Sequence, residues 1–146
     1  MNDKTILGFW SNHDCSYALL ENGVPIIHDE YERFIREKEP PGDSLEFYCK
    51  NFGDFNNIKH FATCHPVSKS RQYLSFESLV NTVDQNDGTL TIVGHHQAHA
   101  ANAFFSSNLE RALIVTMDGG GIEDEKGTAS AFTVWQGDRN KITELE

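Results

Sequence analysis

Runs of apolar residues bounded by polar turn-formers mark three strands at the start of the chain. Thr5 to Trp10 and Ser16 to Leu20 are rich in apolar and aromatic residues, and Glu21-Asn22-Gly23 is typical of a hairpin turn into Val24 to His28. The chain is therefore expected to open as three antiparallel strands. The turn between the first two strands, Ser11 to Asp14, exposes a histidine and an aspartate.

Beyond the hairpins, the spacing of apolar positions predicts helices alternating with strands. The expected helices are a charged one from Asp29 to Lys38 capped by Asp29, one at Ser44 to Asn51, a broken one around Tyr73 to Val83, and an Ala-rich one opening on His95. The expected strands are Ile58 to Thr63, Thr89 to Val93, Ala112 to Met117, Ala129 to Trp135, and a return strand beginning near Lys141. This order predicts an α/β fold with a mixed sheet.

The segment from His95 to Phe105 carries the candidate metal ligands. In a helix, His95 and His99 are four residues apart and share one face, which is metal-ligand spacing. Asp118 follows an apolar strand and can deliver a third ligand where α/β proteins build their sites. His96 points about 100° away and is expected to orient a ligand rather than bind the metal. The alternative is that the histidines lie on a helix face and bind nothing.

Asp118-Gly119-Gly120-Gly121 allows two interpretations that do not exclude each other. Consecutive glycines let backbone amides turn toward a phosphate, and they also suit a hairpin turn between the flanking strands. The chain has no P-loop motif and no Gly-x-Gly-x-x-Gly motif. A zinc-protease site is not supported either, because His96 stands where that motif requires a glutamate.

Two smaller groups of polar residues are candidate site residues with equally simple structural explanations. His13 and Asp14 lie at the tip of the first turn, where polar residues, including Asx-turn formers, are common. Arg33, Arg36 and Lys38 form a basic cluster that can bind phosphate or carboxylate groups. The alternative for this cluster is a solvated helix face, with Arg36 paired to Glu32.

Charge and cysteine content exclude several classes of partner. Lys plus Arg is 12 against 22 Asp plus Glu in 146 residues, a net charge of -10, so nucleic acid and anionic membranes are not expected partners. Three cysteines without a Cys-x-x-Cys motif fit a reducing cytoplasm rather than a disulfide framework. No apolar run reaches the roughly 18 residues of a membrane span, and the N-terminus does not resemble a signal peptide.

Five motifs resemble, in order, the N-terminal domain of the carbamoyltransferases that modify nodulation factors, cephamycins and aminoglycosides. They are Ser11-x-His13-Asp14-x-Ser16-x-Ala18-Leu19, Asn22-Gly23, Glu32-Arg33-Phe34-x-Arg36-x-Lys38, His95-His96-x-Ala98-His99-Ala100-Ala101-x-Ala103-Phe104 and Asp118-Gly119-x-Gly121. The resemblance implies an actin-like ATPase (ribonuclease H-like) subdomain, akin to the threonylcarbamoyl-transfer proteins of tRNA modification. Residues 1–146 are then the N-terminal part of a carbamoyltransferase domain, incomplete without its remaining half.

The resemblance also implies the chemistry and the site. A companion domain activates carbamoyl phosphate with ATP to carbamoyl adenylate, and this domain moves the carbamoyl group to a hydroxyl of a small molecule. His95, His99 and Asp118 are implied to hold a divalent metal, with Fe²⁺ favoured over Zn²⁺ or Mn²⁺. His13, with Asp14 beside it, is implied as the base or orienting group. Arg33, Arg36, Lys38 and the glycines 119–121 are implied to bind the anionic donor.

The sequence departs from the family at two places, and other functions stay open. Tyr31-Glu32 replaces a pair of acids, and Asn102 replaces a small hydroxyl residue in the histidine helix. The fourth metal ligand, the adenine-binding half and the activating domain are expected in missing C-terminal domains or a partner subunit, so the segment alone is expected to be inactive. One alternative is a non-catalytic binding or interaction domain, and another is a different enzyme on this fold, such as a sugar kinase or a peptidase-like relative.

Overall fold

The computed structural model describes residues 4–11, 14–38, 40, 42–53, 58–66 and 71–145, with only the backbone described for residues 71–75. The chain divides into two compact units, Met1–Ile92 and Val93–Glu146.

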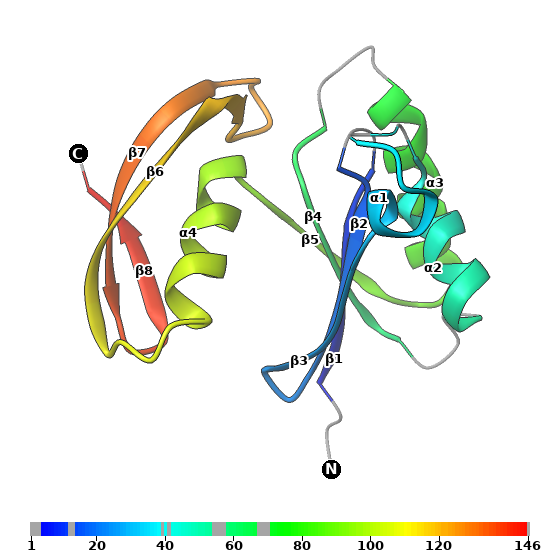
Figure 1. Ribbon diagram of the computed structural model, residues 1–146, viewed down its shortest axis with the longest axis horizontal. Helices are drawn as coiled ribbons and strands as arrows, with labels where there is room; N and C mark the ends of the chain where they lie inside the picture. The colour runs from blue at the N-terminus through cyan, green and yellow to red at the C-terminus, as the bar shows by residue number, and fades with distance from the viewer. Residues whose placement is uncertain are drawn as a thin grey trace. The chain divides into compact units, whose positions relative to one another are not determined.

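The first unit is built on a five-stranded mixed sheet in the order β3-β2-β1-β4-β5 (Figure 1). β1 (Thr5–Trp10), β2 (Ser16–Glu21) and β3 (Val24–Glu30) form the expected antiparallel meander. β4 (His60–Cys64) pairs parallel to β1, and β5 (Thr89–Val93) completes the sheet. The predicted α/β class with a mixed sheet opening on hairpins is therefore confirmed.

The hairpin between β2 and β3 turns where the sequence predicts. Asn22 and Gly23 both have positive φ, 52° and 82°. Positive φ at both central residues defines the type I′ turn, whose twist matches that of paired strands. Beyond this turn the register of β2 and β3 shifts between Leu19 and Leu20, which brings Tyr17 opposite Asp29. The Tyr17 hydroxyl donates a 2.7 Å hydrogen bond to the Asp29 carboxylate.

Three helices lie in the described part of this unit, and two of them differ from expectation. α1 (Tyr31–Ile35) is shorter than the predicted helix from Asp29 to Lys38, because β3 continues through Asp29 and Arg36 ends the helix in the left-handed region, at φ 63°. Asp29 is therefore not its cap. α3 (Arg71–Gln85) is continuous rather than broken.

The remaining helix, α2 (Ser44–Phe52), matches the prediction closely. The Asp43 carboxylate caps its N-terminus by accepting hydrogen bonds from the backbone N–H groups of Leu45 and Glu46, at 2.9 and 3.2 Å. These bonds satisfy donors that the first turn of a helix otherwise leaves unpaired.

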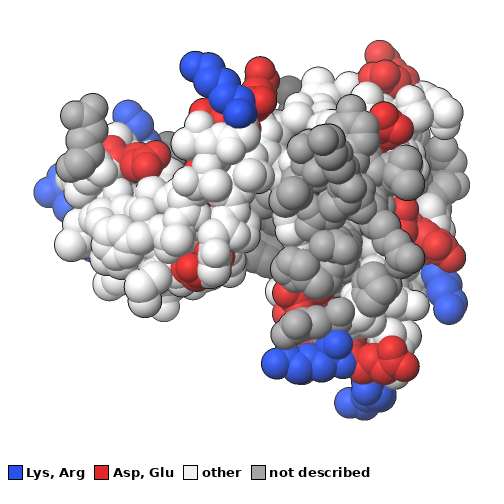
Figure 2. Space-filling model, turned by 90° about the horizontal axis from the view of Figure 1, so that it is seen from above, with Lys and Arg blue, Asp and Glu red and all other residues white. Residues whose placement is uncertain are grey.

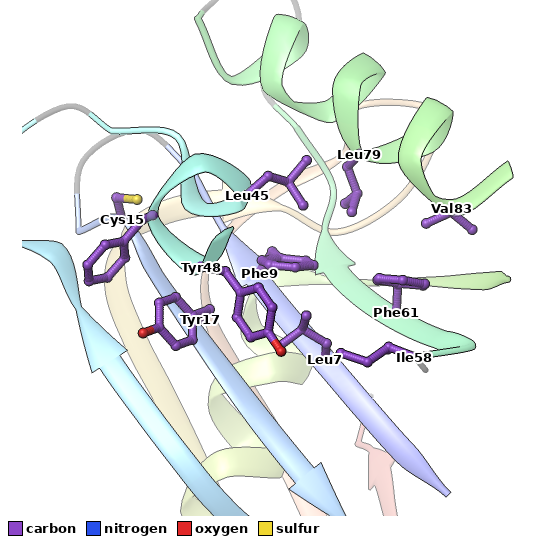
Figure 3. Packing of buried hydrophobic residues seen from close by; sticks show 11 residues of the cluster. Leu7, Phe9, Cys15, Tyr17, Leu45, Tyr48, Ile58, Phe61, Leu79 and Val83 are labelled. Atoms are coloured by element: carbon purple, nitrogen blue, oxygen red, sulfur yellow. The ribbon is translucent and has the colours of Figure 1, made fainter. Parts of the chain in front are cut away.

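The core of the first unit lies between the sheet and helices α2 and α3 (Figure 3). Alternate residues of each strand face the helices, as the period of two requires. The buried side chains come from β1, β2, β4, the segments before β2 and β4, α2 and α3: Leu7, Phe9, Cys15, Tyr17, Leu45, Phe47, Tyr48, Ile58, Phe61, Leu79 and Val83.

The second unit packs one helix on an antiparallel three-stranded sheet. The helix is α4 (His95–Phe105), and the strands are β6 (Arg111–Ile122), β7 (Ala129–Asp138) and β8 (Lys141–Glu144). Ala100 and Phe104 of α4 pack on Ile114 and Trp135 of the sheet. Large apolar side chains on the other face of the sheet are exposed within this unit: Leu113, Val115, Met117 and Phe132.

The chain that joins β6 and β7 differs in part from the sequence expectation. β6 does not end at Met117 but continues to Ile122, so the hairpin turn lies in residues 123–128 rather than at the glycines. The Asp124 carboxylate holds this turn by accepting hydrogen bonds from the Lys126 and Thr128 backbone N–H groups, at 2.9 and 3.0 Å. The predicted antiparallel pairing of the two strands is confirmed.

On the face that Figure 2 shows, acidic and basic side chains lie mixed in small groups. Within the described part of the chain, every helix is too short or too polar to cross a lipid bilayer. None of the three cysteines forms a disulfide bond, and Cys15 is buried whereas Cys49 is exposed.

Candidate metal centre

One row of α4 side chains anchors the helix, and the neighbouring row presents two imidazoles. His96, Ala100 and Phe104 follow the four-residue spacing of one helix face and are all buried against the sheet. His95 and His99 lie on the adjacent face, which leaves their rings only partly covered. The packing of this buried row against the sheet therefore fixes where the imidazoles of His95 and His99 emerge.

The carboxylate that meets these imidazoles sits in a β-bulge. The pairing of β6 with β7 shifts between Met117 and Gly121, so that residues 118–120 interrupt the regular ladder. The Gly120 backbone N–H donates a 2.6 Å hydrogen bond to Asp118 Oδ1, which fixes the carboxylate and leaves Oδ2 toward the histidines. Asp118 was expected at the end of a strand, but it lies inside one, where bulges commonly redirect side chains at sites.

The three predicted ligands converge as the sequence predicts. Asp118 Oδ2 lies 2.5 Å from His95 Nε2 and 3.2 Å from His99 Nε2, and the two Nε2 atoms are 3.2 Å apart. Ligand atoms bound to one ion at about 2.1 Å lie about 3.0–3.4 Å from one another. Two of the three distances already fit this range, and the His95 to Asp118 hydrogen bond needs to open by about half an ångström.

The electrostatics of Asp118 favour its ionised form. Partial burial acts to raise the pKa of this carboxyl group, but three influences outweigh it: the hydrogen bond from His95, the hydrogen bond from the Gly120 backbone, and the charges of His95 and His96. Together they lower its pKa from 3.8 to about 2. Asp118 is therefore a carboxylate at neutral pH, as a metal ligand must be.

His96 lies behind the three converging side chains rather than among them, and its role in orienting a ligand stays a prediction. Its fully buried ring places Nε2 at 3.0 Å from the Ser130 carbonyl oxygen and Nδ1 at 2.9 Å from Thr116 Oγ1. Because a carbonyl only accepts, the hydrogen-bond network assigns the proton to Nε2. The same nitrogen lies 3.6 Å from Asp118 Oδ1, so His96 lines the back of the carboxylate.

At two of the three positions, 120 and 121, the local structure explains why the residue is glycine. Gly120 has a φ of 117°, a backbone conformation that side chains disfavour. Gly121 lies directly under the imidazole of His95, where a Cβ atom would overlap the ring. Gly119 has open space around its Cα. The glycines thus shape the bulge around Asp118 and His95, and phosphate binding by them stays a prediction.

The remaining predicted site residues belong to the first unit. His13 lies outside the described residues, and Asp14 is exposed in a turn with a φ of 54°. Arg33 is paired with two acids, Glu30 at 2.8 Å and Glu32 at 3.4 Å. Arg36 and Lys38 follow the short helix α1 and are exposed. Their roles at a common donor site stay predictions.

Sequence reasoning missed residues that reach the histidine helix from the sheet. Thr116 and Ser130 contact the His96 ring, and the Glu123 carboxylate accepts the His96 backbone N–H. For Thr116, the signal in the sequence is the alternation of β6, which places this polar residue at an inward-facing position of an apolar strand. Nothing local to Glu123, which is 27 residues from its partner, signals that contact.

Comparison with known proteins finds relatives by sequence and by structure. No family model matches the chain. It is 31% identical to the nodulation protein NolNO of Sinorhizobium fredii over 75% of the chain and 20% of that protein. It is 45% identical to the uncharacterized protein sll1178 of Synechocystis sp. over 90% of the chain and 27% of that protein. The chain thus spans about a fifth and about a quarter of these relatives.

The structural neighbours confirm the predicted actin-like fold. HypF of T. kodakarensis superposes with a TM-score of 0.71 at 18% identity, over 99% of this chain and 19% of that one. YeaZ from Pseudomonas aeruginosa superposes with a TM-score of 0.50 at 13% identity, over 97% of this chain and 67% of that one. Together with the NolNO match, these likenesses confirm the resemblance seen in the sequence motifs. By sequence, the chain is therefore similar to part of the nodulation protein NolNO, as the motifs predict.

Proposed function

We propose that this chain is the metal-binding part of an ATP-dependent O-carbamoyltransferase. The reaction moves a carbamoyl group from carbamoyl adenylate to a hydroxyl group of a small molecule. The observation that carries the proposal is the convergence of His95, His99 and Asp118 on one point. Kinship with the nodulation protein NolNO supports the transferase class.

The ligand set suits a divalent transition metal. Two imidazole nitrogens and one carboxylate oxygen on one side of an ion are the set used by non-haem Fe²⁺ sites, and Zn²⁺ and Mn²⁺ also accept such ligands. A divalent cation held there supplies Lewis-acid polarisation of a carbonyl or phosphoryl oxygen. The side chain of His99 is 54% exposed within its unit, so the site has an open side from which a donor can approach.

The transfer step needs a base near the acceptor. The acceptor oxygen forms a bond to the carbamoyl carbon, the bond from that carbon to the adenylate phosphate oxygen breaks, and AMP leaves with the electron pair. The hydroxyl proton passes to a general base, for which we propose His13, with Asp14 beside it. An imidazole suits this task because its ordinary pKa lies near neutral pH.

Binding of the anionic donor is assigned to cationic and backbone groups. We assign it to Arg33, Arg36, Lys38 and the backbone amides of Gly119, Gly120 and Gly121. Arginine forks and clustered amides both suit phosphate oxygens. The net charge of -10 favours a neutral or cationic acceptor over nucleic acid or anionic membranes.

Formation of the donor is assigned to polypeptide outside this chain. The relatives are about four to five times longer than the matched region, and further domains or a partner subunit would make carbamoyl adenylate from carbamoyl phosphate and ATP. Cysteines that form no disulfide bond and an Fe²⁺ site both suit the reducing cytoplasm.

The test uses the intact protein with Fe²⁺, ATP, carbamoyl phosphate and a panel of sugar and aminoglycoside acceptors. Carbamoylated acceptor together with pyrophosphate is expected, and His99→Ala should abolish the carbamoylated product. A metal-loaded intact protein that forms no product with any acceptor and releases no pyrophosphate would instead indicate a non-catalytic binding domain. Full activity in His99→Ala would remove the metal from the mechanism.

A further inference from the structure

The metal-ligand helix α4 begins without a cap of its own. Its N-cap residue is Gly94, which has no side chain, and the first turn contains no acidic residue. The first backbone N–H groups of a helix have no partner within the helix, and they carry a partial positive charge. This end of α4 therefore needs an acceptor from elsewhere, and the metal ligand His95 is the first residue of the helix.

Glu123 supplies that acceptor from the hairpin turn after β6. Its two carboxylate oxygens lie 3.1 and 3.2 Å from the backbone nitrogen of His96. Its own backbone N–H donates a 2.8 Å hydrogen bond to the Thr128 carbonyl, which fixes the residue at the base of the turn. A Cβ atom at Gly94 would come within 2.5 Å of the Glu123 carboxylate, so the glycine at the N-cap makes room for this contact.

Residues 118–123, from the bulge in β6 to the turn that follows the strand, therefore hold the first turn of α4 in three ways. Asp118 accepts a hydrogen bond from His95, Gly121 lies under the His95 ring, and Glu123 accepts the His96 backbone N–H. Two of these contacts involve the imidazole, and the third acts on the backbone that carries it. A shift of the helix N-terminus along the sheet would move His95 and His99 together relative to Asp118.

We propose that Glu123 is a positioning residue for the metal centre. It ties the N-terminus of α4 to the strand that carries Asp118, so that both imidazoles meet the carboxylate. The inference rests on the metal site of the proposed function. Glu123 is not a metal ligand in this role, because its carboxylate is directed to the His96 backbone N–H.

The test compares Glu123→Ala with Glu123→Gln in the 146-residue chain, with Glu125→Ala as the matched control. Glu125 is an exposed glutamate in the same hairpin turn.

The first measurement is hydrogen exchange of the His96 backbone amide in metal-free protein, followed by NMR. The second is affinity for Fe²⁺ added anaerobically. Circular dichroism melts check folding, and Glu123→Met, which keeps bulk without an acceptor, replaces the alanine variant if that one does not fold.

The alanine variant should speed His96 amide exchange about 5- to 10-fold, the value of one lost hydrogen bond. It should weaken Fe²⁺ binding about 10- to 100-fold, as loss of a supporting contact does at other metal sites. Glutamine keeps an accepting oxygen and should stay within about threefold of the original chain, and Glu125→Ala should change neither measurement.

Three results would overturn the proposal or its basis. Unchanged Fe²⁺ affinity in a folded alanine variant means that Glu123 has a structural role only. Equal losses in the glutamine and alanine variants mean that the charge itself is required, as for a ligand. If the unaltered chain binds no Fe²⁺, the proposed metal site fails, and the exchange measurement still decides whether Glu123 caps the helix.

Discussion

The Nε2 atoms of His95 and His99 face one another at 3.2 Å across one turn of α4. Each also lies close to the same carboxylate oxygen of Asp118, at 2.5 and 3.2 Å. The two imidazole nitrogens and the carboxylate oxygen all direct lone pairs toward one point. They cannot all be satisfied by hydrogen bonds to one another, because too few protons lie between them. They form a good arrangement around a cation.

Replacing His99 by alanine should therefore weaken metal binding without disturbing the fold. The His99 side chain is 54% exposed, so its loss leaves no cavity in the core. Affinity for Fe²⁺ should fall at least about 10- to 100-fold, the range seen for weaker, supporting contacts. Gln97→Ala, at an exposed position of the same helix, is the control and should bind as before. Equilibrium dialysis with metal analysis measures both, and equal affinities would show that His99 is not a ligand.

The 146-residue chain by itself should show no turnover. The proposed metal ligands lie in Val93–Glu146, and the activation of carbamoyl phosphate is assigned to polypeptide outside the chain. With chemically prepared carbamoyl adenylate and acceptor, product should stay at the level of the uncatalysed reaction. Mass spectrometry of the acceptor is the measurement. Carbamoylated product above that level would show that these residues suffice for transfer.

The cysteines should differ sharply in reactivity. Burial, reinforced by the negative charge of Asp43, raises the pKa of the Cys15 thiol from 9.0 to about 12. The folded state therefore keeps Cys15 protonated at pH 9, and the stability that this group contributes is present below pH 9 and lost as pH rises toward 12.

Iodoacetamide at pH 8.5 should accordingly modify exposed Cys49 and spare Cys15 until denaturant is added. Peptide mapping by mass spectrometry reads out the two sites, and Cys49→Ser is the control that removes the fast reaction. Native labelling of Cys15 at the rate of Cys49 would contradict its buried placement.

Neighbouring positions on β6 should differ in their contribution to stability. Ile114 is 7% exposed and packs under α4, whereas Met117 is 78% exposed on the opposite face. Ile114→Ala should cost about 2–4 kcal/mol of unfolding free energy through lost burial and a cavity. Met117→Thr should stay within about 0.5 kcal/mol, since threonine suits a strand. Urea unfolding followed by tryptophan fluorescence compares them, and equal losses would mean that both faces of the sheet are covered.

The elements that local chemistry decides could be predicted from the sequence. Asn22-Gly23 is a turn wherever it links two strands, and the four-residue spacing of His95 and His99 places them together in any helix. The sequence also predicted that Asp118 meets these histidines, although it placed the residue at the end of a strand and the structure places it in a bulge inside β6.

The bounds of α1 and β6 could not be predicted, because contacts distant in sequence decide them. Asp29 looked like a helix cap, but pairing with β2 and the hydrogen bond from Tyr17 keep it in a strand. The glycines after Asp118 looked like a turn, but β7 pairs again at Gly121 and draws them into β6 as a bulge. In both cases pairing across the sheet outweighs local propensity.

The glycines after Asp118 provide a direct test of the two functions assigned to them. A methyl group at Gly121 would overlap the His95 ring, whereas one at Gly119 meets open space. Gly121→Ala should therefore displace His95 from Asp118 and weaken Fe²⁺ binding by about 10-fold or more, like other changes that disturb ligand orientation. Gly119→Ala should leave Fe²⁺ affinity unchanged.

The same pair of variants separates metal support from donor binding. If backbone amides of this segment also bind a phosphate, the methyl group of Gly119→Ala obstructs the approach of that anion, because close approach to the chain is what glycine permits. In the intact protein this variant should then raise the KM for ATP or carbamoyl phosphate while the bound metal is retained. If KM and metal content both stay unchanged in Gly119→Ala, the glycines serve the fold of the bulge and the placement of His95, and the donor phosphate is bound elsewhere.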